Sequence, residues 1–230
     1  MVNTNQKIFF KKESDSFYKE LKEEIENYFL KKNIDKYANN FMFFKMSIFF
    51  LVYFGSYSTI FYCPNTYYLI INYSFIGIWG VFLGLNVGHD AAHNAIFKTK
   101  KYNKLLVHVF DLLGTNSYNW KNRHVGAHHL YPNVINMDSD IQQTNVVKIF
   151  PSDKHQSFHF IQYLYMPFLY MIYIFRWVVY RDFKDIFSSN IGGYDNSKYP
   201  IKEVIKMLLF KFIYLFSFIV LPWLILKLPF

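Results

Sequence analysis

The sequence has a single cysteine among its 230 residues, Cys63. One thiol can form neither an internal disulfide framework nor a Cys-x-x-Cys metal site, so both are excluded. Any metal bound by this chain must therefore be held by imidazole and carboxylate groups.

Charged side chains are missing from residues 46–89, a run of 44 residues. A helix crosses the bilayer core with about 20 residues. The run therefore predicts two spans that turn near Cys63, Pro64 and Asn65, where proline interrupts a helix. A buried hairpin of a soluble protein is the alternative, but soluble cores rarely hold an uncharged run of this length.

The net charge is +9, yet no basic stripe stands apart from the apolar segments. We therefore expect membrane lipids as partners and no nucleic acid. Nine Lys lie in residues 1–45 and eight Lys or Arg in residues 90–157, whereas the turn between the spans has none. The positive-inside rule predicts that both basic regions face the cytoplasm.

Three further segments complete the predicted topology. Residues 13–32 have apolar side chains at helical spacing, which predicts an amphipathic helix at a domain or membrane surface. Residues 158–180 are apolar but contain Pro167 and Arg176, and the basic segment after them favours an interfacial or re-entrant position. Residues 207–230 predict a third span.

We thus predict an all-α integral membrane protein, with helical spans and a cytoplasmic helical cap, as one domain over residues 1–230. The cap would carry most of the histidines. The expected parts are a cytoplasmic N-terminal region (1–45), two spans (46–88), a cytoplasmic histidine-rich region (89–157), an interfacial segment (158–180) and a third span (207–230).

Five of the eight histidines lie in two short clusters. His89 and His93 are four residues apart, as are His124 and His128, and this spacing places two side chains on one helix face. His129 should point about 100° away from His128, so it would serve a second ion or complete the first from another side. Imidazole suits iron, zinc, copper and nickel. The clusters predict a metal centre at the membrane face.

Nearby acids are candidates to hold these imidazoles. A histidine that ligates a metal usually donates its other ring N–H to a carboxylate or carbonyl. Asp90, Asp138 and Asp140 lie within reach in sequence, although turn and cap chemistry is an equal alternative for Asp138 and Asp140.

The two clusters and their flanks resemble the membrane fatty-acid desaturases, in particular bacterial acyl-CoA or acyl-lipid desaturases. Gly-Leu-Asn-Val-Gly-His-Asp-Ala-Ala-His at 84–93 is similar to their first histidine box. His124–His129, with Asp111-Leu-Leu-Gly and Ser-Tyr-Asn-Trp before it and Tyr131-Pro-Asn after it, is similar to the second box. The resemblance covers most of the chain.

The resemblance implies an oxidoreductase of lipid metabolism that uses O2 to insert a cis double bond into a fatty acyl chain. It implies two non-haem iron ions held by His89, His93, His124, His128 and His129. A fatty acyl-CoA or an acyl lipid would be the substrate, with Lys121 and Arg123 near its head group. A separate donor of the ferredoxin or cytochrome type would supply electrons, and a bacterial inner membrane would be the location.

The sequence departs from the family in one respect. The family's third box, Gln-x-x-His-His, is missing, and no histidine follows His159. We therefore expect a C-terminally incomplete domain with an incompletely liganded centre, and an inactive fragment is one interpretation of this chain. The alternatives are a related hydroxylase that uses the same histidines, and a non-catalytic metal-binding membrane remnant.

Overall fold

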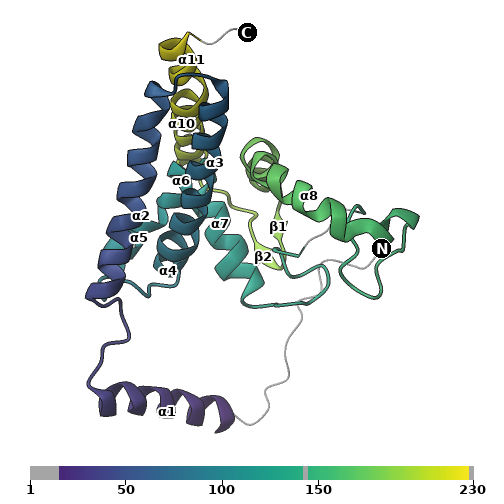
Figure 1. Ribbon diagram of the computed structural model, residues 1–230. Helices are drawn as coiled ribbons and strands as arrows, with labels where there is room; N and C mark the ends of the chain where they lie inside the picture. The colour runs from purple at the N-terminus through teal and green to yellow at the C-terminus, as the bar shows by residue number, and fades with distance from the viewer. Residues whose placement is uncertain (1–15, 142–144, 228–230) are drawn as a thin grey trace. The chain divides into compact units, whose positions relative to one another are not determined.

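The computed structural model describes residues 16–141 and 145–227, and this part of the chain is almost entirely helical (Figure 1). The described residues contain two strands, each of two residues, and otherwise form helices, turns and coil. The chain divides into two compact units, Met1–Val107 and His108–Phe230. The predicted all-α class is confirmed, and the position of a cytoplasmic cap stays a prediction.

The first unit is built around a helical hairpin. Its elements are α1 (Ser16–Lys32), α2 (Asn40–Thr59), the 3-10 turn η1 (Ile60–Tyr62), α3 (Thr66–Leu83), the π-helical turn η2 (Gly84–Gly88), α4 (His89–Ala92) and α5 (Lys100–Val107).

The turn between α2 and α3 falls where the sequence predicts it. Asn65 caps α3, and its side-chain oxygen accepts a hydrogen bond from the backbone N–H of Tyr68 at 3.2 Å. Below the turn, the ring of Phe49 packs on Trp79 and Phe82 at centroid distances of 5.5 and 5.8 Å. Aromatic contacts between the helices therefore fix the hairpin.

The amphipathic helix α1 begins at Ser16, and residues 13–15 of the predicted helix lie outside the described residues. None of its residues is buried, and Phe17 and Leu30 are 75% and 77% exposed. Its helical character is confirmed, whereas its surface role stays a prediction.

The second unit combines short helices, a hairpin and two long helical runs. Its elements are α6 (Val109–Leu112), α7 (Ser117–Arg123), the π turn η3 (His124–His128), the 3-10 turn η4 (Ser157–Ile161), α8 (Gln162–Arg176), the π turn η5 (Trp177–Arg181), α9 (Asp182–Ile186), β1 (Asn190–Ile191), β2 (Tyr194–Asp195), α10 (Ile201–Leu215), the π turn η6 (Phe216–Val220) and α11 (Leu221–Leu226).

The helix α10 packs closely beside the α6–α7 connection. Gly114 has φ +84°, and a side chain there would stand 2.8 Å from the ring of Tyr214. Glycine allows both the left-handed backbone and the close approach. The amine of Lys211, one turn earlier, donates a hydrogen bond to the Gly114 carbonyl oxygen at 3.0 Å.

Among the described residues, four helical segments are long and apolar enough to cross a membrane: Asn40–Tyr62, Thr66–Ala92, Ser157–Ile186 and Ile201–Leu226. The first two match the predicted pair of spans. The fourth contains the predicted third span but begins earlier, and residues 228–230 of that span lie outside the described residues. The third covers the segment predicted to be interfacial.

Candidate metal centre

The first histidine cluster follows the π turn η2. The backbone N–H of His89 bonds to the carbonyl oxygen of Gly84, five residues earlier, which widens the helix just before the cluster. The rings of His89 and His93 then lie 4.7 Å apart, centroid to centroid. Nδ1 of His89 lies 3.1 Å from a carboxylate oxygen of Asp90. Two imidazoles, one with a carboxylate partner, therefore lie together at the end of the α3 run.

The second cluster lies on another π turn, and this changes where His129 points. The backbone N–H of His129 bonds to the carbonyl oxygen of His124 at 3.0 Å, a five-residue step. Nε2 of His129 lies 3.1 Å from Nε2 of His124. The predicted divergence of about 100° concerned His129 and its neighbour His128 and assumed 3.6 residues per turn. In the π turn, the ring of His129 lies at centroid distances of 4.5 Å from His124 and 5.3 Å from His128.

Carboxylates reach the Nδ1 atoms of two imidazoles in this cluster. Nδ1 of His124 lies 2.9 Å from Asp140, and Nδ1 of His128 lies 2.8 Å from Asp138, which is 1% exposed. Burial opposes ionisation of Asp138, but hydrogen bonds from the Asn133 N–H and from His128 prevail and lower its pKa. Burial likewise opposes ionisation of Asp140, and the bond from His124 lowers its pKa.

The geometry of this cluster fits a metal ion. Two imidazole nitrogens on one ion, with bonds of about 2.1 Å and angles of 90–109°, lie about 3.0–3.4 Å apart. The observed Nε2 to Nε2 distance of 3.1 Å falls in this range. Imidazole ligands suit non-haem iron, although they also suit zinc, copper and nickel.

The two clusters belong to different compact units, the first to Met1–Val107 and the second to His108–Phe230. Each cluster by itself supplies part of a coordination shell. The prediction that all five histidines serve one centre stays a prediction.

The histidines outside the clusters have structural partners. His159 is buried, its Nδ1 accepts a hydrogen bond from the Gln156 N–H, and its Nε2 lies 3.1 Å from the Asn145 carbonyl oxygen. His108 pairs with the buried carboxylate of Asp111 at 2.6 Å. Neither belongs to a group of possible ligands among the described residues.

The two predicted head-group residues differ in their surroundings. Lys121 is half-buried, whereas Arg123 is 5% exposed and its guanidinium contacts the carboxylate of Asp185. Arg123 is thus already paired with a carboxylate, and a head-group role for either residue stays a prediction.

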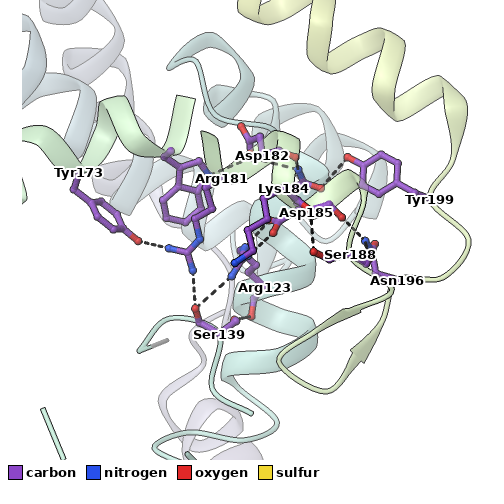
Figure 2. Close-up of polar contacts among 12 residues, drawn as sticks. Arg123, Ser139, Tyr173, Arg181, Asp182, Lys184, Asp185, Ser188, Asn196 and Tyr199 are labelled. Carbon is purple, nitrogen blue, oxygen red and sulfur yellow. Dashed lines mark hydrogen bonds and ion pairs between the residues drawn. The ribbon is translucent and has the colours of Figure 1, made fainter. Parts of the chain in front are cut away.

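Sequence reasoning missed a buried polar network that joins α7 to η5, α9 and α10. Figure 2 shows its contacts around Arg123, Arg181 and Asp185. Asp182 is fully buried and accepts hydrogen bonds from the Lys211 amine at 2.8 Å and the Asn116 N–H at 2.9 Å. Asp185 binds Arg123 from the same helix. The only sequence signal was the group of charges that follows the apolar segment 158–180, which we interpreted as a basic flank.

Comparisons with known proteins agree with these features. The family model for fatty acid desaturase matches residues 64–230. The acyl-lipid (8-3)-desaturase of Physcomitrium patens is 26% identical over 91% of this chain and 44% of its own length. The sn-1 linoleoyl-lipid 6-desaturase of Synechocystis sp. is 27% identical over 80% of this chain and 51% of its own length. The sn-1 linoleoyl-lipid 6-desaturase of Arthrospira platensis is 25% identical over 96% of this chain and 60% of its own length.

The chain spans about half the length of the curated relatives it matches. No solved structure matches it. The family match covers more than two thirds of the sequence and includes both histidine clusters. The chain belongs to the fatty acid desaturase family.

Proposed function

We propose that this chain belongs to the catalytic domain of an O2-dependent fatty acyl desaturase. The enzyme would insert a cis double bond into a membrane-associated acyl chain. The observation that carries the proposal is the second cluster, in which His124 and His129 present Nε2 atoms at the spacing of two ligands on one ion. Membership of the desaturase family supports the reaction class.

In this proposal His89, His93, His124, His128 and His129 hold two non-haem irons. When bound, the irons supply the oxidising chemistry with O2 that attack on an unactivated methylene requires. The carboxylates of Asp138 and Asp140 would fix the ring orientation of His128 and His124, because each would accept a hydrogen bond from Nδ1–H and leave Nε2 to bind the ion.

We propose an acyl lipid rather than a CoA ester as substrate, since the relatives named above are acyl-lipid and linoleoyl-lipid desaturases. A separate electron donor of the ferredoxin or cytochrome type would provide the two electrons. The basic residues around both clusters favour a cytoplasmic position for the site. The bacterial inner membrane stays an expectation.

We also propose that Ser157–Ile186 lies along the membrane interface. Near its start, the Gln162 side chain makes two bonds to the backbone of Lys148, each of 3.1 Å. Near its end, Arg181 donates to the Ser139 carbonyl oxygen. About 28 Å of helix separates Gln162 from Arg181, so both ends of the segment are bonded to one connection, residues 139–148.

The described residues of that connection, 139–141 and 145–148, lie in neither a helix nor a strand. If the helix crossed the bilayer, the connection would have to cross beside it, although backbone outside helix and strand does not satisfy its hydrogen bonds in hydrocarbon. In Figure 1, α8 also runs across the direction of α10 within the same unit. An interfacial position avoids this cost.

Expression of the natural gene in a host of known fatty acid composition tests the function. We expect a new unsaturated fatty acid with the unaltered protein and with His155→Ala, whose exposed side chain lies outside both clusters. His128→Ala should abolish the product. A hydroxylated product with no new double bond would instead assign a related hydroxylase, and unchanged lipids in cells that contain iron-loaded protein and a donor would refute the proposal.

A further inference from the structure

Ser139 lies between the two carboxylates that hold the second cluster, and it is fully buried. Its carbonyl oxygen accepts hydrogen bonds from two guanidinium groups, Nη1 of Arg123 at 3.4 Å and Nη2 of Arg181 at 2.6 Å. Its hydroxyl donates to the Arg123 carbonyl oxygen at 2.7 Å. Figure 2 shows these contacts converging on one residue.

Each guanidinium is itself held in place. Arg123 binds both carboxylate oxygens of Asp185 in a bidentate pair, with Nε to Oδ2 at 2.6 Å. Arg181 donates to the hydroxyl of Tyr173 and lies 4.5 Å above the ring of Trp177. Both arginines are buried, at 5% and 7% exposure, so neither can swing away without losing these partners.

We propose that Arg123, Arg181 and Asp185 are positioning residues for the metal centre. They fix the Ser139 carbonyl and thereby hold Asp138 and Asp140 at bonding distance from His128 and His124. The proposal rests on the function proposed above, because it assigns a purpose to the carboxylates only if the histidines bind metal.

The electrostatics favour this role over simple packing. Two buried cations point at one neutral carbonyl, and burying charge costs free energy that an apolar contact would avoid. Such a network instead fixes the orientation of the Ser139 carbonyl. Nδ1 to carboxylate distances of 2.8 and 2.9 Å on either side of Ser139 leave little tolerance, since a functional site needs its groups placed within about 0.5 Å.

Titration of the full chain in detergent micelles with Co²⁺ alone tests the proposal. The absorption bands of Co²⁺ report the ligand field, and the titration gives an affinity. We expect Arg181→Met to weaken Co²⁺ binding roughly 10–100-fold and to alter the absorption bands. Loss of a group that holds a metal ligand in place typically has an effect of this size. Lys184→Met is the matched control, since Lys184 is exposed on the adjacent helix α9.

A double-mutant cycle separates positioning from general destabilisation. If Arg181 acts through the carboxylate, Arg181→Met should cost much less affinity in an Asp140→Asn background, whereas independent effects would add. Additive losses would overturn the proposal. Should Arg181→Met fail to fold, Tyr173→Phe removes only the hydroxyl that holds Arg181, and a few-fold loss of affinity is then expected.

The two proposals fail in different ways. If the unaltered chain binds Co²⁺ and His128→Ala does not weaken this binding, the metal centre and the positioning role are both refuted. Binding that depends on His128 but is unchanged by Arg181→Met and Tyr173→Phe would overturn only the positioning role.

Discussion

The carboxylates beside the histidines are the first residues to test. Replacement of Asp138 by Asn keeps the shape of the side chain but removes the charge that makes His128 a better ligand. We predict a loss of Co²⁺ affinity of roughly 10–100-fold for Asp138→Asn. Asp153→Asn is the control, because among the described residues that carboxylate accepts bonds from the backbone N–H groups of Ile149 and Phe150 in its own turn. Equal affinities of the two variants would contradict the prediction.

The buried ion pair of Lys211 and Asp182 makes a second prediction. Lys211 is 5% exposed, and its amine also bonds to the carbonyl oxygens of Gly114 and Val178. Lys211→Met leaves the Asp182 carboxylate buried without its cation, which should cost about 3–5 kcal/mol of stability. Thermal unfolding in detergent checks this against Lys202→Met, an exposed lysine on the same helix. Equal midpoints of thermal unfolding for Lys211→Met and Lys202→Met would refute this prediction.

At the scale of residues, the sequence identifies candidate partners where they are close in the chain. His89 and Asp90 are neighbours, and Asp138 and Asp140 follow the second cluster within sixteen positions. The partners of Arg123 and Lys211 could not be predicted, because Asp185 is 62 residues from Arg123 and Asp182 is 29 residues from Lys211. Only the packing of η5, α9 and α10 brings them together.

At the scale of elements, the π turns are what periodicity could not predict. A pattern with 3.6 residues per turn describes His89 with His93, but it misplaces His129 relative to His124. One extra residue per turn rotates His129 back toward His124. Such turns are rare and often occur at functional sites, yet the sequence contains no reliable signal for them.

The β1–β2 hairpin supports the second cluster and gives a third prediction. Gly192 has φ +56°, and a Cβ there would collide with the carbonyl oxygen of Met137, next to Asp138. Gly192→Ala should cost about 1–2 kcal/mol through its left-handed backbone alone and should also weaken Co²⁺ binding, since relief of the collision moves the loop. Gly77→Ala, which meets nothing within 4 Å, is the control for both measurements. Unchanged affinity in Gly192→Ala would show that the loop does not depend on the hairpin.

At the scale of the whole molecule, the two long apolar helices of the first unit were the most predictable feature. An uncharged run predicts a membrane hairpin because charge is costly in hydrocarbon, and α2 and α3 occupy that run. The segment Ser157–Ile186 is different, since its length and composition are compatible with a crossing. Its position depends on contacts with residues 139–148, which hydropathy does not report.

Labelling from one side of the membrane makes the last prediction. In a Cys63→Ser background, single cysteines at Gln156, Phe187 and Tyr62 report both ends of Ser157–Ile186 and the turn between α2 and α3. If the segment lies along the interface, an impermeant maleimide should label Gln156→Cys and Phe187→Cys from the same side, and Tyr62→Cys from the opposite side. A crossing helix would instead place Gln156 and Phe187 on opposite sides. That result would require residues 139–148 to pass through the bilayer with the helix, and it would refute the interfacial position.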